Sequence, residues 1–119
     1  MKPALLIIDH GSRLDDANQM LEGVASLCRQ ARPNLIVEIA HMELASPTIE
    51  EGFIACVEKG ANHITAHPYM LSPGRHATQD IPRLVKEVAS RYPDIQLSIT
   101  DPLGIHPKLG ELILERANL

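Results

Sequence analysis

Aromatic residues are scarce in this chain, which has two tyrosines, one phenylalanine and no tryptophan among its 119 residues. Proteins that bind single-stranded nucleic acid stack the bases on aromatic side chains, so this shortage argues against such a surface. The formal net charge of −4 also argues against a surface that binds the phosphates of a nucleic-acid backbone, which needs an excess of lysine and arginine. Nucleic acid is therefore not an expected partner.

Cysteine and long apolar runs are scarce as well. Cys28 and Cys56 form no CxxC pair, and each lies in an apolar helical pattern, which predicts buried free thiols in a reducing compartment. No stretch approaches the roughly 18 apolar residues of a membrane span, and the N-terminus lacks the longer apolar region of a signal peptide. We expect a cytoplasmic protein that does not enter a membrane.

Several catalytic motifs are missing too. Without GxxxxGK[ST] or GxGxxG, neither ATP nor a dinucleotide is indicated. There is no GxSxG elbow, and although Ser12 follows His10-Gly11, nothing in the sequence places a base for a hydrolase triad. Phosphoryl chemistry on Asp9 would need a lysine at a later strand end, and none is found there.

Strand-like and helix-like segments alternate along the rest of the chain. Short apolar runs predict strands at residues 4–8, 35–40, 62–67 and 95–99, and each is followed by a helical pattern. Ser46 is the expected N-cap of the second helix, with Pro47 at its first position. The last helix has Leu109, Leu112 and Ile113 on one face.

This alternation predicts an α/β fold with right-handed crossovers. We expect a single domain over residues 1–119, with a four-stranded parallel sheet in the order 2-1-3-4 and helices on both faces. Ligands of such sheets bind beyond the carboxyl ends of the strands. Ionisable residues are concentrated in those loops here, namely Asp9, His10, Arg13, His41, Glu43, His67, Arg75, His76 and Asp101.

His10 directly follows the first strand, and His76 ends a loop that the Pro73-Gly74 turn directs back toward the sheet. From its position alone, His10 is equally well explained by a hydrogen bond to a neighbouring loop. Together with His76 and the carboxylate of Glu43, it makes a suitable set for a divalent metal such as Fe(II), Co(II) or Ni(II).

The other histidines are weaker candidates. His63 and His67 share a strand face, but four residues of strand separate them by about 13 Å, too far to hold one metal. His63 is expected at the opposite sheet edge in a structural role. His67, His41 and His106 are expected in supporting or structural positions, with His106 at a helix start.

Taken together, these loops resemble one family. The segments LLIIDHGSR, EIAHMELASPTI, GANHITAHPYMLSPGRHATQDIP and DPLGIHP are similar, in this order and spacing, to the small sirohydrochlorin chelatases of the CbiX/SirB group, which are class II chelatases. The resemblance runs essentially from end to end. It implies a metal-inserting lyase that places Co2+ or Fe2+ into sirohydrochlorin without ATP, in siroheme or cobalamin biosynthesis. Divalent metal would be a substrate, and no permanently bound cofactor is implied.

The resemblance also assigns residues. His10 and His76 match the pair that handles the metal and removes protons, and Glu43 matches the third polar member. The substrate carries several carboxylates, so Arg13 and Arg75 are candidate clamps, with Ser12 and Ser72 as weaker ones. This chain has Asp9 where the family often has glycine, and His41 where it often has phenylalanine. Asp9 is a candidate for orienting the His10 loop, and His41 for adding a basic or ligating group.

Two further expectations concern metal choice and assembly. The histidine-rich loop of nickel-inserting archaeal members does not occur here, which favours iron or cobalt over nickel. Larger relatives have two similar lobes facing one another across a cleft, and 119 residues make one lobe. A homodimer would restore the cleft that a macrocycle needs.

Two alternatives remain at this point. A carrier that binds metal or tetrapyrrole without inserting the metal would use the same two histidines. A receiver-like interaction module is less well supported, because the Asp9-His10 turn lacks the acidic cluster that holds Mg²⁺ in such modules.

Overall fold

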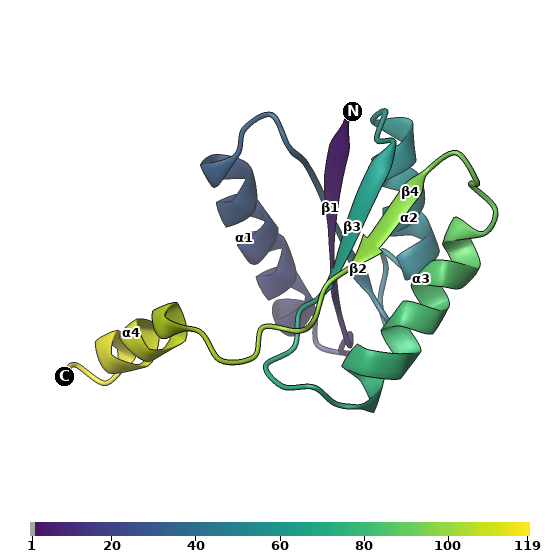
Figure 1. Ribbon diagram of the computed structural model, residues 1–119. Coiled ribbons are helices and arrows are strands. Elements are labelled where there is room, and N and C mark those ends of the chain that lie inside the picture. Colours follow the sequence, from purple (N-terminus) through teal and green to yellow (C-terminus); the bar gives the residue numbers. More distant parts are fainter. Residues whose placement is uncertain (1) are drawn as a thin grey trace.

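The computed structural model describes residues 2–119 and contains the predicted parallel sheet, in the order β2-β1-β3-β4. All three strand pairs are parallel. The elements in chain order are β1 (Pro3–Asp9), α1 (Asp15–Ala31), β2 (Ile36–His41), α2 (Ile49–Glu58), β3 (His63–Pro68), the π-helical turn η1 (His76–Asp80), α3 (Ile81–Ala89), β4 (Gln96–Ile99) and α4 (Pro107–Arg116) (Figure 1).

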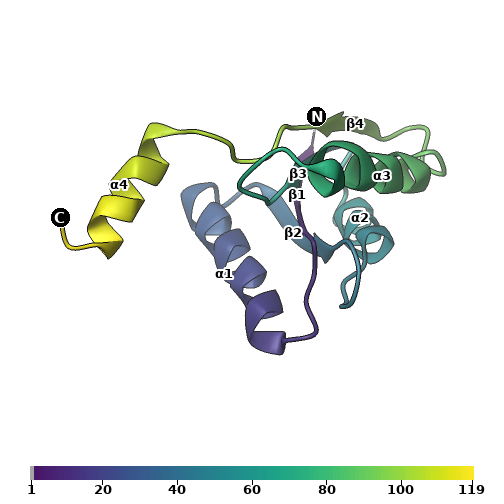
Figure 2. The same cartoon turned by 90° about the horizontal axis from the view of Figure 1, so that it is seen from below.

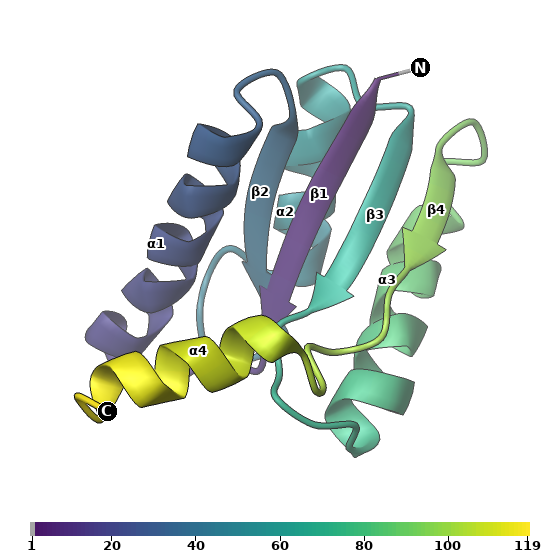
Figure 3. The ribbon, with the colours of Figure 1, turned by 60° about the vertical axis from the view of Figure 1, so that its left-hand side comes forward.

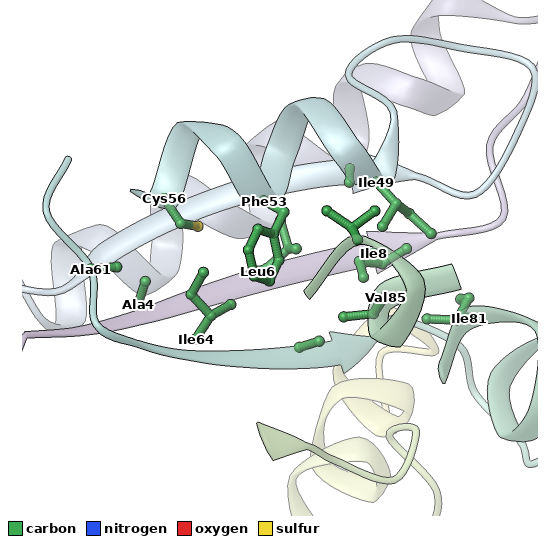
Figure 4. Packing of buried hydrophobic residues seen from close by; sticks show 13 residues of the cluster. Ala4, Leu6, Ile8, Ile49, Phe53, Cys56, Ala61, Ile64, Ile81 and Val85 are labelled. Carbon is green, nitrogen blue, oxygen red and sulfur yellow. The ribbon is translucent and has the colours of Figure 1, made fainter. Parts of the chain in front are cut away.

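The main core lies between the sheet and the helices α2 and α3. Alternate residues of β1 point to this side, so that Leu6 and Ile8 meet Phe53 of α2 and Val85 of α3, all fully buried (Figure 4). β1 is apolar on both faces, because α1 covers its other side, whereas β3 is apolar only on the side of α2 and α3.

The other face of the sheet is only half covered. Helix α1 packs there over β1 and β2, where Leu21 and Ala25 are buried with Ile7 and Val37. The strands β1, β3 and β4 are seen from this side in Figure 3, beside α1 and with α2 and α3 behind them. The last helix of the chain does not lie on the sheet.

That helix is α4, which extends away from the sheet at the carboxyl ends of the strands (Figures 1 and 2). Its face of Leu109, Leu112 and Ile113 has the predicted spacing, but no residue of α4, described along its whole length, is buried. The prediction of helices on both faces is confirmed, since α1 covers one face and α2 and α3 the other, while α4 covers neither. The cause is the segment before α4, which is held to the loop before His76 by bonds from Leu103 N–H to the Met70 carbonyl and from Gly104 N–H to the Leu71 carbonyl.

The second helix begins two residues later than predicted. Thr48, not Ser46, is the N-cap of α2: its hydroxyl accepts a hydrogen bond from the Glu51 backbone N–H, and the Glu51 carboxylate accepts one from the Thr48 N–H. This reciprocal capping box satisfies two free backbone donors. Pro47 therefore precedes the helix, in a cis Ser46–Pro47 peptide.

The prediction of buried free thiols is confirmed for Cys56 and only partly for Cys28. Cys56 is buried and Cys28 half-buried, both as free thiols. Burial raises the pKa of the Cys56 thiol to about 12, with a smaller contribution from the charge of Glu38. Across residues 2–119, every helix is too short or too polar to cross a membrane.

Gly52 allows the close approach of α2 to β2. A Cβ at Gly52 would lie 2.6 Å from the Ile39 carbonyl oxygen and 2.9 Å from Leu6 Cδ1. We expect Gly52→Ala to lower the free energy of unfolding by about 1–3 kcal/mol, because backbone would have to move. Urea unfolding measures this change. The matched control is Gly23→Ala in α1, where the added Cβ meets nothing within 4 Å and should be neutral or stabilising. Equal effects at both positions would contradict this explanation.

Candidate metal-handling site

The carboxyl ends of β1 and β2 stay paired beyond the strands. Asp9 and His41 are register partners, and two further backbone bonds continue the pairing, from Met42 N–H to the Asp9 carbonyl at 2.8 Å and from Glu43 N–H to the His10 carbonyl at 3.1 Å. Gly11 is required here: its φ is +94°, and a Cβ would lie 1.9 Å from the Glu43 carbonyl oxygen. The loops that carry His10 and Glu43 are therefore held against each other by their backbones.

This pairing sets the His10 imidazole beside the Glu43 carboxylate. Nε2 of His10 lies 3.0 Å from Oε1 of Glu43, and Nδ1 lies 3.1 Å from the Gly11 carbonyl oxygen. Both side chains are about half exposed, at 41% and 53%. Nε2 thus faces a carboxylate oxygen that solvent can reach, so a hydrogen-bond acceptor lies directly beside the ring.

His76 reaches the same place from the other side of β1. Its ring centroid lies 4.8 Å from that of His10, with the planes tilted by 57°. Nδ1 of His76 donates to Oδ2 of Asp80 at 2.8 Å, one turn later in η1. With the proton on Nδ1, the Nε2 lone pair is available for a metal, an arrangement typical of carboxylate-oriented histidine ligands.

Asp80 is a functional candidate that the sequence interpretation did not single out. The signal was present in the spacing, since residues i and i+4 face each other along a helix. The segment before the third helix was interpreted as a loop, however, and its helical turn at His76–Asp80 was not expected.

The side chains gathered here offer few ligands to one metal. Among residues 2–119, no three His, Cys, Asp or Glu side chains are arranged as a metal-holding group. His10 and His76 can each supply one nitrogen, while Glu43 already contacts His10. Such a site leaves most coordination positions of a divalent metal to water or to another ligand.

His41 does not join these residues as a ligand, contrary to one of the two roles considered for it. The residue is 1% exposed, and its Nδ1 donates to Oδ1 of Asp9 at 2.6 Å. Asp9 in turn precedes His10. The pair, in which His41 is buried and Asp9 half-buried, thus links the last residues of β1 and β2 through their side chains as well as their backbones.

The four candidate substrate-binding residues lie in the surrounding loops. The Ser12 hydroxyl accepts a hydrogen bond from Leu14 N–H, while its backbone is bonded twice to the Asn18 side chain, so Ser12 shapes the first loop. Arg13 is exposed and lines, with Ser12, a cavity of about 650 Å³ at the β2 edge. His10, Glu43 and His76 are not among the lining residues. Ser72 and Arg75 are exposed in the loop before His76.

The remaining histidines have the structural positions predicted for them. His63 lies at the amino-terminal end of β3, where Nε2 contacts the Ser98 hydroxyl at 2.8 Å. His67 contacts the Thr100 hydroxyl at 2.7 Å, and burial lowers the pKa of its imidazole. His106 is the N-cap of α4 and accepts a hydrogen bond from Lys108 N–H.

The Asp9–His41 pair should be measurable in a double-mutant cycle. Asp9→Ala and His41→Phe are each expected to lower the free energy of unfolding by about 1–3 kcal/mol, because each leaves a polar group without its partner. The double variant should lose clearly less than the sum of the two. Denaturant unfolding of all four proteins gives the coupling. Strict additivity would show that the pair contributes no mutual stabilisation.

Known proteins match this chain along nearly its whole length. The CbiX family profile matches residues 4–118. The chain is 41% identical to the chloroplastic sirohydrochlorin ferrochelatase of Arabidopsis thaliana over 112 residues, which are 94% of this chain and 50% of that protein. It is 31% identical to the sirohydrochlorin cobaltochelatase of Saccharolobus islandicus, covering 96% of this chain and 92% of that protein.

A solved structure gives the same result. The crystal structure of the sirohydrochlorin chelatase SirB from Bacillus subtilis subspecies spizizenii, in complex with cobalt, superposes with a TM-score of 0.91 at 39% identity, covering 99% of this chain and 50% of that chain. The chain thus spans about half the length of the ferrochelatase and of SirB. By profile, sequence and fold, the chain belongs to the CbiX family.

Proposed function

We propose that this protein inserts a divalent metal, Co2+ or Fe2+, into sirohydrochlorin without ATP. The observation that carries this proposal is the meeting of His10, Glu43 and His76 at the carboxyl edge of a CbiX-family sheet. The matched relatives are named as sirohydrochlorin ferrochelatase and cobaltochelatase. The metal is a substrate in this reaction, and the proposal includes no resident cofactor.

In this proposal, His10 and His76 hold the incoming metal. His76 contributes Nε2, because its Nδ1–H donates a hydrogen bond to Asp80. His10 contributes Nε2 in exchange for its contact with Glu43. The two nitrogens bind a borderline divalent metal while leaving its other positions exchangeable, and Nε2 of His10 is free to take a proton once the metal has passed to the macrocycle. Few ligands are an advantage here, since the metal has to pass to the four nitrogens of the macrocycle.

The same groups would receive the protons that metal insertion displaces. Two pyrrole N–H protons must leave the macrocycle, and an imidazole accepts protons near neutral pH. Nε2 of His10 lies 3.0 Å from the Glu43 carboxylate, which is exposed enough to pass a proton to water. We therefore assign Glu43 the role of onward proton acceptor.

The loops around the two histidines would bind the carboxylates of the substrate. Arg13 and Arg75 are exposed and can each form paired hydrogen bonds to a carboxylate. Ser72 is exposed in the same loop as Arg75, whereas the Ser12 hydroxyl is partly engaged by its own loop. Ser12 is accordingly the weakest of the four candidates.

A homodimer belongs to the proposal as well. Ligand sites usually enclose most of a small molecule, whereas one open sheet edge would leave one face of a flat macrocycle in water. A second copy facing the first would cover it. The free thiols of Cys28 and Cys56 are in keeping with the cytoplasmic location that we propose.

An insertion assay tests the proposal. Purified protein is mixed with sirohydrochlorin and Fe(II), Co(II) or Ni(II), and insertion is followed by absorbance. His10→Ala and His76→Ala should each lower the rate by about 100-fold or more, because a base and a ligand are lost. His63→Ala is the matched control and should stay near wild type, since His63 lies at the opposite edge and contacts Ser98.

Other outcomes would contradict the proposal. Insertion by the wild-type protein at only the spontaneous rate, with metal or sirohydrochlorin still bound, would identify a carrier. Full activity in His10→Ala would remove His10 from the mechanism. Insertion that is faster with nickel than with cobalt or iron would contradict the metal preference.

A further inference from the structure

Leu44 has a backbone conformation that leucine rarely adopts. Its φ is +71°, in the left-handed region where Cβ comes too close to the following carbonyl oxygen. Among residues 2–119, the other positions with positive φ are three glycines and Asn118, residue types that tolerate this region. Within that part of the chain, a bulky apolar side chain is thus held in a left-handed conformation at Leu44 alone.

The turn that contains Leu44 is fastened at both ends. Glu43 N–H donates to the His10 carbonyl at 3.1 Å, and the Pro47 carbonyl accepts a hydrogen bond from His41 N–H at 2.8 Å. The chain therefore reverses its direction between Glu43 and Pro47. A left-handed residue accommodates such a reversal, and glycine would do so without steric cost. The backbone explains the φ at position 44 but not the leucine side chain.

The hydrophobic core does not explain this leucine either. Leu44 is 52% exposed and belongs to neither buried cluster. Strained residues of this kind concentrate at functional sites and ligand clamps, where the contact they make outweighs the strain. The position of Leu44 agrees with such a role, because it directly follows Glu43, whose carboxylate lies 3.0 Å from Nε2 of His10. An apolar side chain is thus held at the margin of the metal-handling site.

Leu44 also lines the cavity at the β2 edge, together with Ser12 and Arg13. These three residues come from the loops after β1 and β2, which lie at the carboxyl end of the sheet beside the start of α1 (Figure 3). Beyond this end, α1 and β2 contribute acidic lining residues, namely Asp15, Glu22 and Glu38. The cavity thus has an apolar side chain and a guanidinium at its carboxyl end, with negative charge behind them.

Sirohydrochlorin, the substrate of the proposed function, has the chemistry that fits this end of the cavity. It is a flat macrocycle with an apolar ring system and carboxylates around its periphery. The ring system can pack on Leu44 while a peripheral carboxylate forms paired hydrogen bonds with Arg13. The acidic residues behind Arg13 repel a carboxylate that enters more deeply, so the periphery of the macrocycle stops at this point.

We propose that Leu44 is a substrate-binding residue, whose side chain packs against the sirohydrochlorin ring system on the β2 side of His10 and His76. The left-handed strain at this position is retained because glycine would remove the contact. Since the backbone of the turn is fastened to the His10 loop, the contact places the macrocycle at a fixed offset from the two histidines. The inference rests on the proposed function and names one contact by which its substrate is held.

Leu44→Gly tests the proposal, because it should change stability and substrate affinity in opposite directions. Urea unfolding without any ligand should show a folding constant about two- to fivefold higher, since relief of the left-handed strain exceeds the entropic cost of glycine. Titration with sirohydrochlorin in the absence of metal, followed by absorbance, should show a dissociation constant about 10-fold higher or more, since a buried leucine side chain is lost.

Two control variants separate the contact from general effects of the substitution. Leu44→Met keeps an apolar side chain in the same backbone conformation, so both constants should stay within about threefold of wild type. Leu27→Gly makes the same change at a leucine of α1 that is 64% exposed and has a helical backbone. It should lower the folding constant by about fivefold and leave sirohydrochlorin affinity unchanged, the reverse of the pattern at Leu44.

A loss of stability in Leu44→Gly would show that the leucine serves the fold, and unchanged sirohydrochlorin affinity would show that it does not touch the substrate. Either result would overturn the inference. A smaller assembly in sedimentation with affinity unchanged would assign Leu44 to a contact between copies, which also overturns it. The insertion assay is a separate readout: a wild type that binds sirohydrochlorin through Leu44 but inserts no metal would contradict the proposed function and leave this contact in place.

Discussion

The close pairing of β1 with β2 beyond their last residues is the constraint on which the site depends. Two backbone hydrogen bonds and the contact of Gly11 with the Glu43 carbonyl hold the first two strand-end loops together. Because backbone groups make this pairing, it fixes the backbone positions of His10 and Glu43 independently of the contacts that their side chains form. The Asp9–His41 contact adds a side-chain link between the ends of the same two strands.

The two histidines of the site come from different elements and have different partners. His76 is oriented by Asp80 within one turn of the same helix, which leaves a nitrogen free for a metal. His10 is paired with Glu43 from a neighbouring loop, which suits the uptake and transfer of a proton. A short distance between the rings lets both tasks be carried out on one substrate. An insertion reaction needs both, because metal enters as protons leave.

Local patterns in the sequence predicted the sheet and the meeting of His10 with His76. The alternation of strands and helices predicts the strand order and places all carboxyl strand ends at one edge of the sheet. The loops that follow the strands therefore lie close together at that edge. The partner of His41 was not predictable, because the register that places Asp9 opposite it is decided by strand pairing across 32 residues. The outward course of α4 was missed for a similar reason: it depends on bonds from Leu103 and Gly104 to a loop far away in sequence.

The central claim is that His10 and His76 bind the same metal ion. X-ray absorption spectroscopy of the protein loaded with one equivalent of Co(II) counts imidazole ligands through their outer-shell scattering. We expect two imidazoles in the wild type, one in His10→Ala and one in His76→Ala. Two imidazoles retained in either variant, or none in the wild type, would contradict the claim.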